Sequence, residues 1–268
     1  MHFRSTLLKQ MIQTVVFVVV LFAITWTWGL LVAPILMRRG DLGWFLAALL
    51  PSVWTPTLLA ILFIAVTGGV RAIVHDLRRR LRWPETAWLL VAIVVPALAT
   101  GIALTVARVA GDRTSFVPAS ALPLAITLQV ITGALGEELG WRRFLLPRVA
   151  NRYGKVRAIF VVALLWSAWH IPAFFIPEMP QSMMPKLPFL AVVAAFGIFL
   201  GVLFFRTHES VVATITGHLA FNVMFAIGGV RLGSSVFWGI LAVLIALTSG
   251  TLVARVHGDT LKNVSRET

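Results

Sequence analysis

Residues 11–37 decide the fold class of this chain: they read MIQTVVFVVVLFAITWTWGLLVAPILM and contain no charged side chain. A helix needs about 17–25 mostly apolar residues to cross the hydrocarbon core of a membrane. The apolar part of a signal peptide is shorter, at roughly 7–15 residues. The segment is therefore expected to be an uncleaved first transmembrane helix.

Apolar runs of similar length follow one another along the rest of the chain. Hydrophobic residues make up 59% of the sequence and charged residues 12%, whereas a soluble domain carries about 25% charged residues. We therefore expect an all-α fold, a polytopic membrane helix bundle of about eight transmembrane helices. It should form a single integral membrane domain over residues 1–268, with a core motif region at about 118–228. The expected spans are 11–37, 43–67, 86–108, 118–140, 157–175, 187–205, 210–228 and 233–254.

Positive charge is concentrated in alternate connections between these runs. The net charge of +13 would suggest a nucleic-acid partner in a soluble protein, but no nucleic-acid-binding motif accompanies it, so we expect none. Sorted by connection, 17 Lys and Arg residues fall on the side of both termini and 6 on the other. The positive-inside rule then predicts a multi-pass protein of the cell membrane with both termini in the cytoplasm. The Arg78-Arg79-Arg80 run is expected to be a solvated or headgroup-facing loop.

Four acidic or histidine side chains fall inside or directly continue the apolar runs: Glu137, Glu138, His170 and His218. Placing an acidic or basic residue at the membrane centre costs about 2.5–3.5 kcal/mol on insertion scales, so such residues are functional candidates. The chain contains no cysteine. A thiolate nucleophile and a cysteine-ligated metal are therefore excluded.

The spacing of these residues along a helix indicates which side chains share a face. Glu138 and Arg142 lie four residues apart and share a helix face, so Arg142 can neutralise Glu138, while Glu137 is rotated by about 100°. Two further pairs repeat the four-residue spacing: Trp166 with His170, and His218 with Asn222. Taken singly, the charges could be an interfacial cluster at a helix end, and His218 or Asn222 could hydrogen-bond neighbouring helices together.

The expected spans place the candidate residues at different depths in the membrane. At about 1.5 Å per residue, the expected spans put Glu137 near the cytoplasmic face, His170 in the outer half and His218 between them. The groups meet only if the helix that carries Glu137 enters the membrane later, or if tilt and a water-filled cavity close the gap.

Three short motifs at these positions resemble the family of CAAX proteases and bacteriocin-processing enzymes, which includes the type II prenyl endopeptidases. The first family motif, EExxxR, matches residues 137–142, EELGWR. The second, an aromatic residue followed by a histidine, matches 166–170, WSAWH, with Trp in place of the commoner Phe. The third, HxxxN, matches 218–222, HLAFN. Their order and spacing agree over about 85 residues.

The resemblance implies hydrolysis of a peptide bond inside the membrane. By position in the motifs, Glu137 would activate a water as general base, and Glu138, held by Arg142, would support it. The family pattern assigns water orientation or proton shuttling to His170, and oxyanion stabilisation to His218 and Asn222. These roles are physically reasonable, because a desolvated carboxylate is a stronger base and fixed donors in a dry pocket stabilise developing charge.

Metal use and substrate stay open at this stage. Glu137, His170 and His218 could supply the three protein ligands of a catalytic Zn²⁺, although no HExxH helix is present. The partners implied are the lipid bilayer and a membrane-associated peptide, either CAAX-like or of the bacteriocin or leader type. The alternative is a non-proteolytic membrane protein: a proton-linked transporter that uses Glu137 and the histidines as a relay, or an immunity or scaffold protein.

Overall fold

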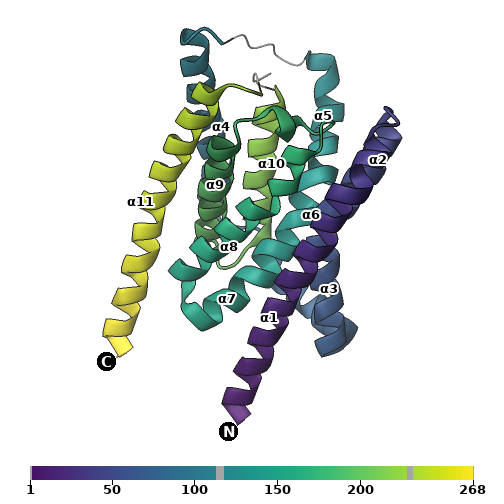
Figure 1. The fold of residues 1–268 in the computed structure, drawn as a ribbon. Helices are drawn as coiled ribbons and strands as arrows, with labels where there is room; N and C mark the ends of the chain where they lie inside the picture. The colour runs from purple at the N-terminus through teal and green to yellow at the C-terminus, as the bar shows by residue number, and fades with distance from the viewer. Residues whose placement is uncertain (1, 113–117, 228–231, 268) are drawn as a thin grey trace.

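A computed structural model describes residues 2–112, 118–227 and 232–267, and all of its elements in these ranges are helical (Figure 1). The elements in chain order are α1 (His2–Thr27), η1 (Trp28–Val32), α2 (Ala33–Met37), α3 (Leu42–Arg80), α4 (Thr86–Val109), η2 (Ala119–Ala121), α5 (Leu122–Gln129), η3 (Val130–Ala134), α6 (Leu135–Glu138), η4 (Leu139–Leu145), α7 (Leu146–Tyr153), α8 (Lys155–Trp169), η5 (Ile171–Phe175), η6 (Pro180–Met183), α9 (Lys186–Arg206), α10 (Val211–Ile227) and α11 (Ser235–Glu267). The predicted all-α helix bundle is confirmed.

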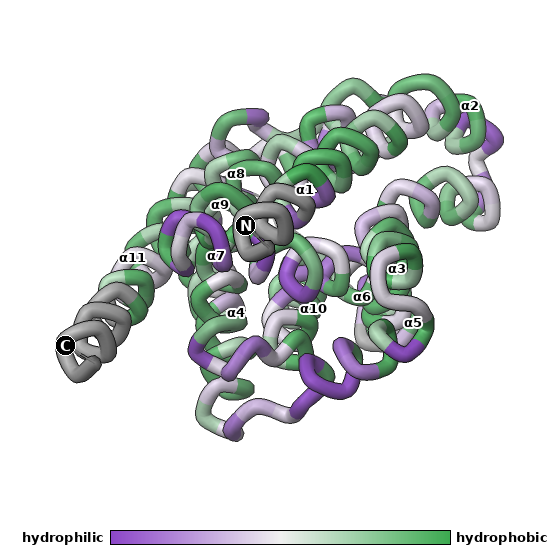
Figure 2. Tube along the Cα trace, turned by 90° about the horizontal axis from the view of Figure 1, so that it is seen from below, coloured by the Kyte–Doolittle hydropathy of each residue, from purple (hydrophilic) through white to green (hydrophobic). Residues whose placement is uncertain are grey.

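Six described segments are long and apolar enough to cross a membrane: Gln10–Met37, Leu42–Arg80, Thr86–Val109, Lys155–Phe175, Lys186–Arg206 and Ser235–Ala254. The apolar helix α10 is shorter, and the segment 122–153 is divided into several helical pieces. Together they correspond to the expected bundle of about eight helices. Figure 2 shows hydrophobic residues along much of the long helices, whereas the short helix α7 is mostly hydrophilic.

The helix α3 continues beyond its predicted end and includes the arginine run. Gly69 adopts φ 70° and ψ −177°, a conformation that favours glycine, and breaks the helix direction there. Arg78, Arg79 and Arg80 then form the last helical turn, so the expected loop is wrong. Arg80 is buried and paired with Asp76 and Glu209, which removes the need for solvent around its charge.

The segment that carries the two glutamates also continues beyond its predicted end at residue 140. Helical structure runs from Leu122 to Tyr153 with π-helical turns at η3 and η4, and Thr132 and Gly133 leave the helical conformation. Such π-helical turns are frequent at functional sites. Glu137 therefore lies near the middle of the segment, and the interfacial cluster at a helix end does not describe it.

Two glycines on either side of the glutamate pair bring this segment against α3. A Cβ atom on Gly136 would lie 2.8 Å from the carbonyl oxygen of Val53, and one on Gly140 would lie 2.4 Å from the carbonyl carbon of Pro56. Only glycine allows backbones to approach this closely. The Gly-x-x-x-Gly spacing thus allows the Glu137–Glu138 turn to pack closely against α3.

The helix α9 occupies the interior of the bundle, where it packs against α8, α10 and α11 (Figure 1). Gly197 and Gly201 face α8, and a Cβ on Gly197 would lie 2.9 Å from the Cβ of Ala163. This close packing fixes α8, and with it Trp166 and His170, relative to the rest of the core.

Candidate active site

Glu138 lies at the centre of a buried polar cluster. Its Oε1 accepts hydrogen bonds from Nη1 of Arg142 at 2.7 Å and from Nδ1 of His218 at 2.9 Å. The side chains of all three residues are at most 5% exposed. The four-residue spacing of Glu138 and Arg142 predicted their contact, and the pair also ties α6 to α10 through His218.

Glu137 points the other way and contacts α8. Its Oε2 accepts a 2.7 Å hydrogen bond from the indole Nε1–H of Trp166, and no other hydrogen bond to this carboxylate is present among the described residues. The guanidinium carbon of Arg142 lies 4.2 Å from the centroid of the Trp166 ring. Trp166 therefore links the two carboxylates: its N–H holds Glu137, and its face stabilises the cation that holds Glu138.

The two histidines are oriented by the same ring atom. Nδ1 of His170 lies 2.8 Å from the carbonyl oxygen of Trp166, and Nδ1 of His218 lies 2.9 Å from the Glu138 carboxylate. Both partners are acceptors, so both histidines carry a proton on Nδ1. Their Nε2 atoms are then left to act as acceptors when the rings are neutral, or as donors when they are protonated.

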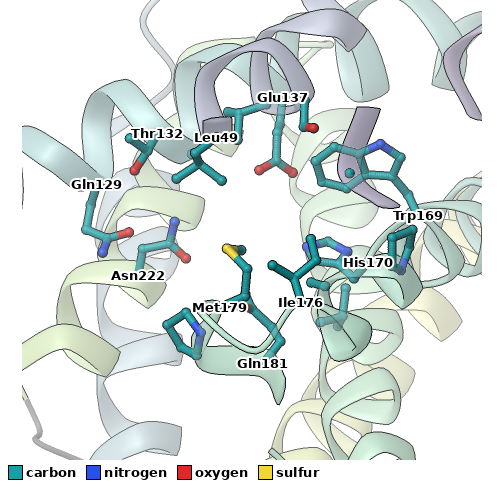
Figure 3. A pocket seen from close by; sticks show the side chains of 18 of the residues that line it. Leu49, Gln129, Thr132, Glu137, Trp169, His170, Ile176, Met179, Gln181 and Asn222 are labelled. Carbon is teal, nitrogen blue, oxygen red and sulfur yellow. The ribbon is translucent and has the colours of Figure 1, made fainter. Parts of the chain in front are cut away.

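A cavity of about 370 Å³ lies in front of these groups. Glu137, His170, His218 and Asn222 line it, whereas Glu138 and Arg142 do not. Figure 3 shows the Glu137 carboxylate pointing into the open space, with His170 and Trp169 on one side of it. The structure thus separates the residues that face the cavity from those that support them.

Asn222 lies on the opposite side of the cavity from His170, beside Gln129 and Thr132 (Figure 3). A Cβ atom on Gly133 would lie 2.7 Å from Nδ2 of Asn222, so the non-helical turn at Gly133 makes room for this amide. Sequence reasoning missed Gln129, whose amide lines the cavity. Its position two turns before Glu137 was the available signal, but Gln129 lies outside the three motifs.

The three candidate zinc ligands are not grouped as a metal site requires. Among residues 2–112, 118–227 and 232–267, no three His, Asp or Glu side chains lie close enough to hold a metal ion. The Trp166 ring contacts all three residues: its N–H donates to Glu137, and its centroid lies 5.3 Å from the ring centroids of both His170 and His218. In this arrangement Glu137, His170 and His218 do not fit a three-ligand zinc site.

Residues 118–224 match the family described as type II CAAX prenyl endopeptidase Rce1-like. The motif region is thus similar to the CAAX proteases. A relative is the CAAX prenyl protease 2 of Methanococcus maripaludis, which is 26% identical over 116 residues. That match covers 41% of this chain and 40% of the relative's length, so the chain aligns with less than half of the curated protein. The family resemblance seen in the three motifs is thereby confirmed for this region, and the apolar helices show a multi-pass membrane protein.

Proposed function

We propose that this protein is an intramembrane endopeptidase in which Glu137 activates the attacking water. The observation that carries the proposal is the separation of the two adjacent glutamates. Glu138 is fully buried and bonded to Arg142 and His218, whereas Glu137 has one bond, from Trp166, and faces the cavity. A carboxylate that is positioned but not neutralised by a salt bridge is suited to take a proton from water.

The reaction begins with a water molecule held between Glu137 and the substrate carbonyl. Glu137 removes one proton while the oxygen attacks the carbonyl carbon, and the negative charge moves to the carbonyl oxygen. The protonated Glu137 then gives its proton to the departing amine, which regenerates the carboxylate. The N–H of Trp166 holds the Glu137 side chain in place during both transfers.

The developing oxyanion needs donors on the cavity wall. Asn222 offers a neutral amide N–H₂, and His218 also lines the cavity, where its Nε2 is a donor when the ring is protonated. Donors fixed in a poorly hydrated pocket stabilise this charge better than water, which must first reorient. His170, held by the Trp166 carbonyl, is placed to orient the water through its Nε2.

Cleavage in ¹⁸O-labelled water tests this proposal. Purified protein in detergent is incubated with a mixture of apolar peptides, and mass spectrometry identifies the products. Hydrolysis by an endopeptidase adds one ¹⁸O atom to the new carboxyl end at an internal bond. A Glu137→Gln preparation shows the background from contaminating proteases. A transporter or scaffold gives no labelled product above that background, and equal labelling in the two preparations would refute the proposal.

A further inference from the structure

A second, smaller pocket of about 70 Å³ lies between the start of α1 and the helix α7, and we call it the α1–α7 pocket. Its wall includes Gln10 of α1 and Arg148 and Arg152 of α7. None of its described lining residues also lines the cavity in front of Glu137. The helix α7 directly precedes α8, whereas His170 follows the other end of α8. The two sites therefore lie toward opposite ends of that helix.

The α7 side of this pocket is basic. Arg148 and Arg152 lie four residues apart and share a helix face. Like charges at this spacing destabilise a helix unless an anion compensates them. No Asp or Glu occurs between residues 139 and 177 of the sequence, and no described acidic residue lines the pocket. The two guanidinium groups thus have no acidic neighbour in the pocket wall.

Asp76 attracts Arg148 electrostatically, but other arginines already occupy this carboxylate. Its Oδ1 accepts a hydrogen bond from Nε of Arg80 at 3.2 Å, and its Oδ2 accepts one from Nε of Arg143 at 2.5 Å. Arg148 instead donates from Nη1 to the carbonyl oxygen of Phe144 at 2.9 Å, and its guanidinium carbon lies 3.6 Å from that ring's centroid. In the part of the chain that the structure describes, neither arginine of the pocket forms an ion pair with a carboxylate. Both cations can therefore bind an anionic ligand.

The position of the pocket along the bundle corresponds to the level of lipid headgroups. The first segment that is long and apolar enough to span a membrane begins at Gln10, a lining residue. Figure 1 shows α7 at the end of the bundle from which α1 starts. Tyr153, the single tyrosine of the chain, also lines the pocket and is half exposed. Tyrosine is enriched where a membrane meets water.

An exposed apolar stripe on α1 begins beside these polar groups. Ile12, Val15 and Val19 are 55%, 59% and 60% exposed. Their spacing of three and four residues places them on one face of the helix, and Val15 also lines the pocket. Lipid chains are the solvent for such a face of a spanning helix. A molecule bound in the pocket therefore has apolar surface for acyl chains directly beside its charged group.

We propose that the α1–α7 pocket binds the phosphate group of an anionic membrane phospholipid, with Arg148 and Arg152 as its cationic ligands. Guanidinium groups donate charge-assisted, often paired, hydrogen bonds to phosphate oxygens, and basic pockets between transmembrane helices bind acidic lipid headgroups. The amides of Gln10 and Asn151 supply neutral donors from the two helices. The acyl chains lie along the exposed stripe of α1, so the bound lipid bridges α1 and α7.

Lipid binding to purified protein tests this proposal. The protein is delipidated in a neutral detergent and titrated with phosphatidylglycerol, and native mass spectrometry counts the lipids bound to each molecule. Arg152→Gln removes an exposed cation of the pocket, and the matched control Arg157→Gln removes an exposed cation that does not line it. We expect Arg152→Gln to weaken binding of the first phosphatidylglycerol by about tenfold or more, and Arg157→Gln by less than about twofold. Equal affinities of the two variants would overturn the proposal.

Three further titrations of the wild-type protein test the chemistry of the ligand. Diacylglycerol carries the chains without a phosphate, inorganic phosphate carries the charge without the chains, and phosphatidylcholine carries a cation of its own. Phosphatidylglycerol should bind at least about tenfold more tightly than any of them. Equally tight binding of diacylglycerol would overturn the phosphate assignment, and that of phosphatidylcholine would overturn the requirement for an anionic lipid. Inorganic phosphate that binds as tightly as phosphatidylglycerol would overturn the assignment to a lipid.

Discussion

Arg142→Met is expected to destabilise the protein strongly, because it removes one member of a buried ion pair. The Arg142 side chain is 1% exposed and donates to Glu138 at 2.7 Å. Breaking a buried pair from one side costs about 3–5 kcal/mol, since the remaining charge is left uncompensated. Loss of the cation–π contact with Trp166 adds about 0.5–2 kcal/mol.

The combined loss of about 3.5–7 kcal/mol should lower the melting temperature in detergent by roughly 7–28 °C, at 2–4 °C per kcal/mol for chains of similar size. Arg79→Met is the matched control, because the exposed Arg79 side chain lies 3.7 Å from Glu209 and such surface pairs contribute about 0–1 kcal/mol. The double variant Glu138→Gln, Arg142→Met should recover most of the loss, because neither charge remains and the Gln oxygen can still accept from His218. Equal melting temperatures for Arg142→Met and Arg79→Met would refute the buried pair.

Three further changes have distinct expected outcomes. Trp166→Phe keeps an aromatic ring but removes the N–H that holds Glu137, so turnover in the peptide assay should fall with little change in KM. Asn222→Ala removes one oxyanion donor and should reduce kcat by about 10²–10³; an unchanged kcat would exclude that role. Gly140→Ala should lower the melting temperature, because its Cβ would meet the α3 backbone at 2.4 Å, whereas Gly101→Ala, with open space at the Cβ position, should not.

The sequence predicted much of the fold because apolar run length is a local property. It also predicted the Glu138–Arg142 contact, because residues four apart share a helix face. It placed the end of the glutamate helix too early, at residue 140. The apolar run ends there because Arg142 and Arg143 follow it, but the Arg143 side chain is buried and paired with Asp76, 67 residues earlier in the chain. A local sequence pattern does not indicate an ion-pair partner that lies so far away in the chain.

The candidate site was predicted only in part for the same reason. Sequence spacing separated Glu137 from Glu138 by rotation, but it could not show that Glu137 meets the indole of Trp166, 29 residues later. Nor could it show that the Gly133 turn opens a place for Asn222. Both features depend on how the helices cross. The crossings are set by breaks in the helical backbone and by close contacts at glycines, and hydrophobic periodicity predicts neither the breaks nor the contacts.

Turnover of Glu137→Gln, measured on purified protein with and without a chelator, tests the general-base assignment most directly. Gln is nearly isosteric with Glu, and its side-chain oxygen can still accept from Trp166, so the variant should fold with a melting temperature close to that of the wild type. An amide cannot take the proton of water at neutral pH, so peptide cleavage should fall to background, and the wild-type enzyme should keep its activity with the chelator. Cleavage by Glu137→Gln at the wild-type rate would contradict the assignment. Loss of wild-type activity with the chelator, restored by Zn²⁺, would show that Glu137, His170 and His218 rearrange to hold a metal.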